Sequence, residues 1–336
     1  MSRYAKQVLF TGIGKEGQER LQKSRATIIG LGALGSTLAS HLVRAGVGFV
    51  RLVDRDFVEL DNLQRQVLYD EDDVRGNLPK AAAAAAKLAR INSEVRLDPR
   101  VCDVNYANAE DLARDVDLVL DGTDNFETRF LLNDACVKLG RPWVYGGVVG
   151  SYGMVMAVLP GDGPCFACLV GELPAPGSSP TCDTAGVLNT AVGVVASLEA
   201  NEALKILAGR RDALAGGLQT LDVWQNTSQL IRVPRSPSCA VCVKRGFRHL
   251  ESTASAATSL CGRNAVQITP PPGSTLDLAE TEKKLAPIGA VRRNAYLLKV
   301  AVDGCELTLF PDARAIIQGT HDLAKARSLY ARYVGA

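Results

Sequence analysis

One segment, Ala26 to Asp56, restricts the possible fold more than any other part of the sequence. It consists of a short apolar run, three glycines in the spacing GxGxxG (Gly30, Gly32 and Gly35), a stretch with helical periodicity, and a second apolar run. Glycines with this spacing allow a tight turn, close approach of the backbone to a phosphate, and close packing of a helix on a strand. The elements expected are a strand over Ala26–Ile29, a turn over Gly30–Gly35, a helix over Ser36–Ala45 and a strand over Phe49–Val53. The segment therefore predicts a nucleotide-binding unit.

Apolar runs continue to alternate with helical segments as far as Gly147. The further strands expected are Val95–Val101, Asp117–Asp121 and Trp143–Gly147, and the helices are Lys80–Ile91, Ala109–Arg114 and Phe126–Leu139. Such alternation predicts an α/β fold with a Rossmann-like, mostly parallel sheet that is covered on both faces. Beyond Val148 we expect the sheet to continue into antiparallel strands. These are the 151–160 segment and a hairpin of Leu218–Val223 with Gln229–Val233, around a long helix over Asn189–Leu207.

The length of 336 residues predicts one large domain and one small domain. We expect the large domain to cover residues 1–248 and a polar linker rich in Ser, Ala and Thr to cover residues 249–262. Residues 263–336 then form a small C-terminal α+β domain, whose role the sequence does not indicate. Its expected elements are Ala265–Ile268, Leu276–Leu285, Tyr296–Val302, Glu306–Phe310, Ala315–Gln318 and Asp322–Tyr333.

The composition argues against several classes of partner. Hydrophobic residues make up 47% of the chain, charged residues make up 22%, and the net charge is +2. These values are typical of a soluble globular protein and do not favour nucleic acid as the main partner. No apolar stretch is long enough to span a bilayer, and the first residues lack the apolar core of a secretory signal. We therefore expect a cytoplasmic protein with no membrane partner.

Charged residues after the glycine turn distinguish between possible nucleotides. Asp54 ends the second strand, where an acidic residue binds ribose hydroxyls in such folds, and this feature alone would favour an NAD-dependent oxidoreductase. Arg65 and Lys80 can instead neutralise a phosphate chain, and Lys80 is expected to have an anionic partner because it stands at a helix start. Asp121 and Asp124, in DGTDN, follow a strand at the edge where a carboxylate can hold Mg²⁺. Together these residues predict Mg-ATP and a phosphoryl or nucleotidyl transfer.

Four of the nine cysteines form two CxxC pairs, Cys165 with Cys168 and Cys239 with Cys242. Two such pairs in turn-rich segments are typical of a tetrahedral structural zinc site. The alternative, two redox-active CxxC motifs, would need a thioredoxin-like setting that the sequence lacks. Cys182, in TCDTAGV, is either a nucleophile near a helix start or an incidental loop cysteine.

These motifs, in their order along the chain, resemble those of the ThiF/MoeB/HesA family, bacterial relatives of ubiquitin-activating enzymes. The motifs are RYAKQ, GLGALG, LVDRDFVELDNLQRQ, the lysine of NLPKA, DGTDN, CFAC, TCDTAGV and CAVC, and they cover roughly residues 3–245. The resemblance implies a homodimer that binds Mg-ATP at the glycine turn. It also implies adenylation of the C-terminal glycine of a small ubiquitin-like sulfur-carrier protein that ends in Gly-Gly, with release of pyrophosphate. The implied sulfur donor is a cysteine desulfurase or a rhodanese.

The resemblance further implies roles for individual residues. Those implied in the reaction are Arg65, Lys80, Asp124, Cys182 and Lys6, with Cys182 serving covalent or sulfur transfer. The implied nucleotide-binding set is Gly30, Gly32, Gly35, Asp54, Asp56, Asn62, Arg65, Gln66, Lys80, Asp124 and Asn125. Asp124 would bind magnesium, and the four paired cysteines would bind zinc. Lys6 stands where many members have an arginine that reaches ATP across the dimer, and a lysine keeps the charge but not the bidentate fork.

Three other interpretations stay open. A family member can activate a different carboxylate, either that of a peptide or a substrate of the tRNA-modifying branch. NAD-dependent oxidoreduction would leave Arg65 and Lys80 without a clear purpose. A scaffold could keep the fold without catalysis. The cysteine pairs and the TCDTAGV segment favour the sulfur-carrier branch.

Overall fold

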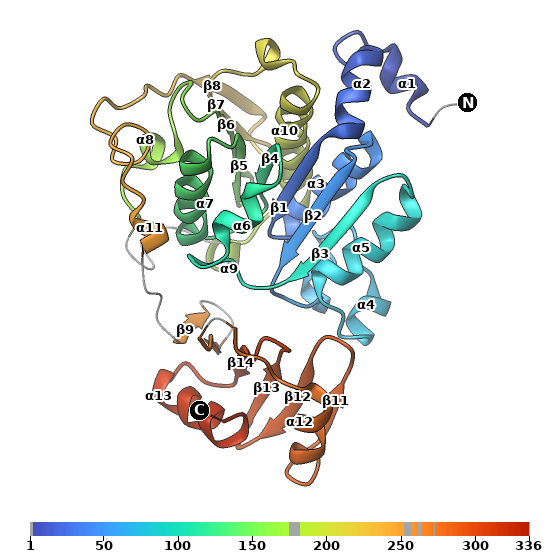
Figure 1. Ribbon diagram of the computed structural model, residues 1–336, viewed down its shortest axis with the longest axis vertical. Coiled ribbons are helices and arrows are strands. Elements are labelled where there is room, and N and C mark those ends of the chain that lie inside the picture. Colours follow the sequence, from blue (N-terminus) through green and yellow to red (C-terminus); the bar gives the residue numbers. More distant parts are fainter. Residues whose placement is uncertain (1–2, 175–181, 252–256, 261–263, 272, 336) are drawn as a thin grey trace. The chain divides into compact units, whose positions relative to one another are not determined.

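The computed structural model describes residues 3–174, 182–251, 257–260, 264–271 and 273–335. The chain divides into two compact units, residues 1–252 and residues 253–336 (Figure 1). Each unit has its own sheet and its own hydrophobic core. No helix in the described ranges is both long and apolar enough to cross a membrane.

An eight-stranded sheet forms the centre of the first unit, in the order β3-β2-β1-β4-β5-β6-β7-β8 (Figure 1). The strands from β3 to β5 in this order run parallel, and β6, β7 and β8 each pair antiparallel with the strand before them. The strands are β1 (Arg25–Ile29), β2 (Phe49–Asp54), β3 (Arg96–Val101), β4 (Leu118–Asp121), β5 (Trp143–Val149), β6 (Tyr152–Val158), β7 (Leu218–Asp222) and β8 (Thr227–Ile231). The predicted Rossmann-like sheet that continues into antiparallel strands is confirmed.

The register of the parallel strands brings three chain segments together at one edge. Ile29, the last residue of β1, pairs with Val53 of β2 on one side and with Asp121 of β4 on the other. The residues that follow these strands therefore lie side by side at the carboxyl edge, where open α/β sheets bind ligands. The glycine turn, Asp54 and the DGTDN segment meet at this edge.

Both faces of the central strands are buried, and the strands are therefore apolar at almost every position. Alternate residues belong to different core clusters: Ile28 and Leu52 pack on one face of the sheet, and Ile29 and Val53 pack on the other. The helices of the first face are α3 (Ala33–Ala45), α5 (Lys80–Ile91) and α10 (Asn189–Leu207), and those of the second are α6 (Ala109–Arg114) and α7 (Phe126–Leu139).

The helix after the glycine turn begins before its predicted start at Ser36. Gly32 is the N-cap of α3, so Gly35 already lies inside the helix. Within the turn, Gly30 requires the left-handed backbone region, with φ of 84°. Gly35 is required by packing instead, because a Cβ there would collide with the carbonyl oxygen of Gly30. The turn is therefore shorter than predicted, and it ends at Gly32.

Short elements that the sequence pattern does not predict connect the main ones. They are α1 (Ala5–Leu9), α2 (Gly14–Lys23), η1 (Leu60–Asn62), α4 (Glu71–Arg75), α8 (Phe166–Val170), α9 (Cys182–Ala185), η2 (Arg211–Ala213) and α11 (Arg248–Glu251). The β7–β8 hairpin is also tighter than predicted, because Asp222 pairs directly with Thr227 and Asn226 adopts a positive φ of 55° in the turn. The second strand of the hairpin therefore ends at Ile231 and not at Val233.

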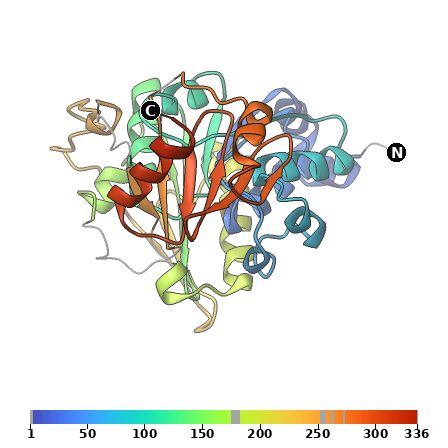
Figure 2. The same cartoon turned by 90° about the horizontal axis from the view of Figure 1, so that it is seen from below.

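The second unit is an antiparallel sheet with two helices packed on one face, and this confirms a small α+β unit. The strand order is β11-β12-β13-β14-β10-β9. The strands are β9 (Ala257–Leu260), β10 (Ala265–Ile268), β11 (Val291–Arg293), β12 (Leu298–Val302), β13 (Cys305–Leu309) and β14 (Ala315–Gln318). Helices α12 (Leu278–Leu285) and α13 (Leu323–Tyr333) can be followed in Figure 2 and share one core with the sheet. The carboxylates of Asp277 and Asp322 cap their first turns.

The segment expected as a linker, residues 249–262, contains most of α11 and the whole of β9. Strand β9 pairs antiparallel with β10, with Leu260 opposite Ala265. Small and polar residues resemble a linker when they are considered alone. A neighbouring strand that supplies hydrogen bonds can nevertheless hold them extended, which the local pattern does not indicate.

Candidate nucleotide site and cysteine cluster

The glycine turn leaves open space on its outer side. The N–H of Gly30 donates to the carbonyl oxygen of Val53 (2.8 Å), which ties the turn to β2. A Cβ on Gly30 would lie 2.7 Å from the carbonyl oxygen of Gly122, so a side chain there would strain the contact with β4. At Gly32 the nearest atom to such a Cβ is Nε2 of Gln66, at 3.8 Å. Gly32 therefore leaves room for a ligand, whereas Gly30 satisfies the packing of the protein itself.

The first turn of α3 points its backbone N–H groups into this space. Gly32 is the N-cap, and no side chain of the described residues caps the helix there. A helix N-terminus carries a partial positive charge and unsatisfied N–H groups. The arrangement suits a phosphate group, as predicted for a strand–glycine turn–helix unit.

Asp54 holds the turn in place through hydrogen bonds to the protein backbone. Its Oδ2 accepts a hydrogen bond from the N–H of Leu31 (2.6 Å), and its Oδ1 accepts one from the N–H of Asp56 (2.7 Å). Burial raises the pKa of Asp54, and the positive charge of Lys80 opposes this effect. Asp54 therefore lies at the same edge as the turn, where the sequence predicted a ribose-binding acid.

Lys80 has the anionic partner that the sequence predicted. Its side chain is only 4% exposed, and Nζ lies 3.7 Å from Oδ2 of Asp56. The backbone N–H of Lys80 also donates to the carbonyl oxygen of Asp56 (2.9 Å). The charge of Lys80 also acts on Asp54, which holds the glycine turn, so the ammonium lies close to that turn.

Tyr69 connects Lys80 to the glycine turn, and sequence reasoning missed it. Its hydroxyl lies 2.8 Å from the carbonyl oxygen of Leu31 and 3.3 Å from that of Lys80. Burial, reinforced by the charge of Asp54, raises the pKa of Tyr69 well above its ordinary value. The neutral hydroxyl is thus a donor to the turn. An aromatic residue close to the VELDNLQRQ motif was the available signal.

Three predicted nucleotide-binding residues in this segment have different surroundings: Asn62, Arg65 and Gln66. Asn62 is buried, and its side chain accepts from the N–H of Glu59 and donates to Asp61, so it closes a capping box at η1. Gln66 is only 3% exposed, and its Oε1 has no partner among the described residues. Arg65 is partly exposed and donates to the carbonyl oxygen of Asp61 (2.8 Å). Gln66, which borders Gly32, and Arg65 are thus the members of this set with polar groups available to a ligand.

The two aspartates of DGTDN are in contrasting environments. Asp121 is fully buried and forms an ion pair with Arg129 (2.9 Å), which the sequence analysis did not identify. Asp124 is exposed at the carboxyl edge of the sheet. Asn125 caps α7 by accepting from the N–H of Thr128 (2.8 Å). Asp121 therefore organises the loop, and Asp124 has a carboxylate available for a cation.

Two further predicted residues lie apart from this cluster or cannot be placed. Lys6 is exposed on α1. The backbone of Cys182 begins α9, but its side chain lies outside the described residues.

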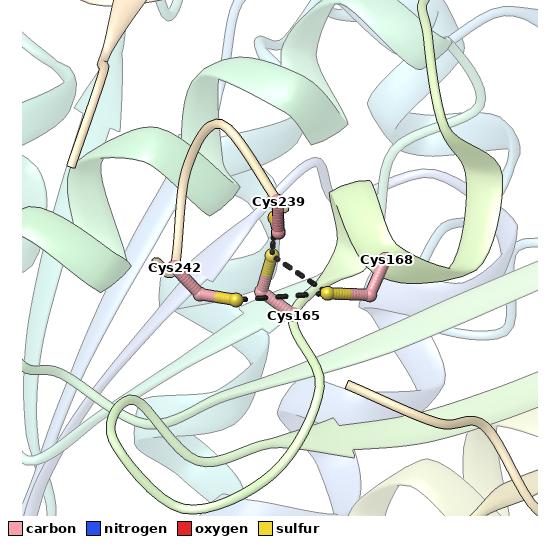
Figure 3. A group of neighbouring side chains, drawn as sticks. All are labelled: Cys165, Cys168, Cys239 and Cys242. Carbon is pink, nitrogen blue, oxygen red and sulfur yellow. Dashed lines mark hydrogen bonds between the residues drawn. The ribbon is translucent and has the colours of Figure 1, made fainter. Parts of the chain in front are cut away.

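The four paired cysteines come together as predicted, although 74 residues separate Cys165 from Cys239 (Figure 3). Their sulfur atoms all lie within 4.8 Å of one another. The Sγ–Sγ distances are 3.6 Å for Cys165–Cys239, 3.6 Å for Cys168–Cys242 and 3.9 Å for Cys165–Cys168. Four thiolates around one zinc ion at about 2.3 Å would be separated by roughly 3.8 Å. The cluster therefore could hold a metal ion with four sulfur ligands.

The surroundings of the cluster also fit a cation. Burial, together with the charges of the other three cysteines, raises the pKa of Cys165 far above its ordinary value. Thiolates at these separations need a cation to coexist. Asn133 of α7 supports the site, because its Oδ1 accepts the N–H of Phe166 (2.9 Å) and its Nδ2 lies 3.8 Å from Sγ of Cys165. Because both loops supply all four ligands and leave no open position, the geometry suits a structural metal and not a catalytic one.

Comparisons with known proteins agree on the family and on the fold. The model of the ThiF family matches residues 4–241. The chain is 44% identical over 337 residues to the sulfur carrier protein ThiS adenylyltransferase of Bacillus subtilis (strain 168), with 99% of each chain covered. It is 39% identical over 251 residues to the SAMP-activating enzyme E1 of Haloferax volcanii, which covers 75% of this chain and 92% of that enzyme.

Among solved structures, Escherichia coli MccB with MccA-N7isoASN has the same fold. The TM-score is 0.64 at 23% identity, and the match covers 72% of this chain and 74% of MccB. The family match ends at residue 241, within the first unit, whereas the match to the Bacillus subtilis enzyme extends through the second unit as well.

Proposed function

Because the chain belongs to the ThiF family, we propose that it adenylates the C-terminal glycine of a small ubiquitin-like sulfur-carrier protein at the expense of ATP. The observation that carries this proposal is 44% identity over nearly the whole chain to an enzyme named for this activity. The arrangement of the site supports it, since one sheet edge combines an open glycine turn, a buried lysine and an exposed carboxylate. That set suits a polyphosphate with a divalent cation better than the single pyrophosphate of NAD.

In the proposed reaction, a carboxylate oxygen of the carrier's terminal glycine attacks the α-phosphorus of ATP. A new C–O–P bond forms, the bond between the α-phosphorus and the bridging oxygen breaks, and pyrophosphate leaves with the electron pair. The N-terminus of α3 and the ammonium of Lys80 bind phosphate oxygens, and Arg65 stabilises charge on the leaving group. Asp54 holds the ribose. Positioning and charge neutralisation account for most of the catalysis in such a step.

Magnesium is the cation that we propose for Asp124. A carboxylate is a hard oxygen ligand, and Mg²⁺ in nucleotide sites is held by one or two carboxylates together with phosphate oxygens. When bound, the ion neutralises phosphate charge. Asp121 is unsuitable for this role because both of its oxygens already accept hydrogen bonds from Thr123 and Arg129.

We propose zinc as the ion of the cysteine cluster. Zinc suits four thiolates in tetrahedral geometry, and it would join the loop after β6 to the segment after β8. Cys182 is proposed for covalent or sulfur transfer, with a cysteine desulfurase or a rhodanese as the donor. A cytoplasmic location also stays a prediction.

A homodimer is proposed because large apolar side chains are exposed beside the proposed active-site residues. Leu9 is 73% exposed and Phe10 is 64% exposed, both close to Lys6, and Leu60 and Val67, on either side of Arg65, are 68% and 67% exposed. Contiguous exposed apolar patches mark contact surfaces, and Leu9 and Phe10 are neighbours in the chain. In a symmetric dimer one self-complementary surface is used twice, so α1 of one protomer can bring Lys6 to the phosphates bound by the other.

The proposal is tested by ATP–pyrophosphate exchange with a purified ThiS-like carrier. Exchange should depend on the carrier, and a carrier without its final glycine should support none, because the attacking carboxylate is then displaced from the α-phosphorus. Asp124→Ala should abolish exchange, and Asp111→Ala, an exposed acid on α6, should not. Carrier-independent exchange, or no exchange with any carrier that ends in Gly-Gly, would contradict the proposal.

A further inference from the structure

Glu199 lies in the middle of α10 and is fully buried against the central sheet. Neither of its carboxyl oxygens has a hydrogen-bond partner among the described residues. An ionised carboxylate in such a place is unfavourable, because burial removes its hydration and only the backbone of Asp121 and the shared guanidinium of Arg129 favour the charge. The carboxyl group is therefore expected to keep its proton.

The Glu199 carboxyl fills the space in front of Gly146 on β5. A Cβ on Gly146 would collide with Oε2 of Glu199, and it would lie 3.5 Å from the carbonyl oxygen of Asp121. Glycine at residue 146 is thus what admits the carboxyl to the junction of β4 and β5. At this junction β4 ends and the segment that carries Asp124 begins.

Arg129 of α7 connects this junction to the candidate nucleotide site. Its Nε donates to Oδ2 of Asp121 (2.9 Å), and its Nη2 donates to the carbonyl oxygens of Thr123 (2.6 Å) and Gly146 (3.2 Å). Asp121 in turn accepts the N–H and the hydroxyl of Thr123. One guanidinium, balanced by one carboxylate, therefore holds the loop that presents Asp124.

The charged groups around Glu199 provide no separate cation for it. Those that face it are Asp121 of β4, Arg129 of α7 and Tyr145 of β5, and Arg129 is already balanced by Asp121. Helices α2, α3 and η2 and strand β6 also pack on α10. Among the titratable groups of these elements, Nε2 of His41 lies 3.3 Å from Oγ of Ser197. The others are exposed: Lys15, Glu16, Glu19, Arg20, Lys23, Arg44, Tyr152, Arg211 and Asp212. Burial, and then the charge of Asp121, raise the pKa of Glu199 well above its ordinary value.

We propose that Glu199 is a positioning residue of the nucleotide site: its uncharged carboxyl fixes the ends of β4 and β5, and through Arg129 the loop that carries Asp124. The catalytic part of this statement rests on the proposed adenylation. When Glu199 loses its proton, a second carboxylate competes with Asp121 for Arg129. The hold of Arg129 on the Thr123 carbonyl then weakens, Asp124 is no longer held in place, and adenylation declines at alkaline pH.

The charge state is tested first, by a measurement that does not depend on activity. Between the pKa of Glu199 in the unfolded chain and its higher pKa in the folded chain, the folded state binds a proton that the unfolded state lacks. The contribution of Glu199 to the stability of the wild type must therefore fall as pH rises through this range. Glu199→Gln has the same shape and no charge. The urea midpoint of this variant minus that of the wild type should therefore increase between about pH 5.5 and about pH 8.5.

Glu202→Gln is the matched control for this comparison. Glu202 is buried on the same helix, but it has partners in Lys205 (2.6 Å) and the N–H of Ala215 (3.0 Å). The urea midpoint of Glu202→Gln relative to the wild type should show no such increase with pH. A Glu199→Gln difference that is constant over pH, or that shrinks as pH rises, would overturn the proposal.

Positioning is tested by exchange kinetics on the full-length protein. Glu199→Gln should keep kcat within about twofold of wild type at neutral pH and should retain it at alkaline pH, where the wild type declines. Glu199→Ala should lower kcat about tenfold and raise the Mg²⁺ concentration required, with the KM for the carrier unchanged. Superimposable pH profiles for wild type and Glu199→Gln would overturn the proposal. A complete absence of wild-type exchange would instead refute the proposed function, and the unfolding comparison would still decide the charge state of Glu199.

Discussion

At the scale of single residues, the proposed nucleotide site is organised by groups that already have partners within the protein. Asp54 accepts two backbone N–H groups, and Lys80 is enclosed beside Asp56. Such prior order reduces the rearrangement needed when charge develops in a transition state. Gln66 differs, because its buried Oε1 has no partner among the described residues and it borders the space at Gly32.

Lys80→Met is expected to reduce kcat of exchange by about 10²–10³-fold, since removal of one fixed charge or donor from the transition state has an effect of this order. Lys87→Met is the matched control, because Lys87 lies on the same helix and is also paired with acids, Asp70 and Asp73, away from the glycine turn. Single-turnover kinetics with saturating carrier measure both variants. Equal losses in the two variants would show that the effect arises from α5 and not from the phosphate contact.

At this scale the sequence predicted residue types better than residue roles. It placed Lys80 at a helix start beside an anion and Asp124 after a strand at the carboxyl edge, and the structure has Lys80 beside Asp56 at the start of α5 and an exposed Asp124 after β4. Residue type alone did not separate Asp121 from Asp124, and only the family resemblance favoured Asp124. The position of Arg129 supplies the physical reason, because it neutralises Asp121. Tyr69 and Glu199 were missed for the same reason: the groups that surround them come from distant parts of the chain.

At the scale of elements, two glycines of the same motif, Gly32 and Gly35, have different surroundings. Gly35 is demanded by packing of α3 on the turn, whereas Gly32 faces open space. A side chain at Gly32 would occupy the space where a phosphate can approach the turn.

Two substitutions in this turn should affect different properties: one weakens ATP binding and the other destabilises the fold. Gly32→Ala should raise the KM for ATP about tenfold, a loss of about 1.4 kcal/mol, because the new methyl group occupies the space open to phosphate. Gly35→Ala should destabilise the protein by about 1–3 kcal/mol, because the new methyl group meets the Gly30 carbonyl. Thermal unfolding with and without ATP separates the two effects. Normal ATP affinity in Gly32→Ala would mean that phosphate does not approach this position.

At the scale of the whole molecule, the sequence distinguished a large unit from a small one, and the chain divides at Ser252 into two units with separate cores. The family match covers the first unit only, and the match to the Bacillus subtilis enzyme extends over both. The second unit is thus shared with that relative.

Assembly is the prediction that belongs to this scale. Phe10→Asp places a charge in the apolar surface next to Lys6, and it should convert a dimer into a monomer and lower exchange about tenfold or more. Ile288→Asp, in the second unit, removes a side chain that is 54% exposed and should leave the dimer intact. Light scattering coupled to gel filtration measures both. A wild-type protein that is monomeric and active would contradict trans participation by Lys6.

The sequence by itself determined the order of the main elements, the glycine turn and the two cysteine pairs, because these depend on local periodicity and on residue chemistry at short spacing. Helices Lys80–Ile91, Phe126–Leu139 and Asn189–Leu207 have the predicted bounds. Only the tertiary structure decided which groups are neutralised and which are available to a ligand. That distinction depends on burial and on partners brought together by the register of β1, β2 and β4. The turn at Gly30 could be found in the sequence, but the space at Gly32 and the burial of Glu199 exist only when the sheet has formed.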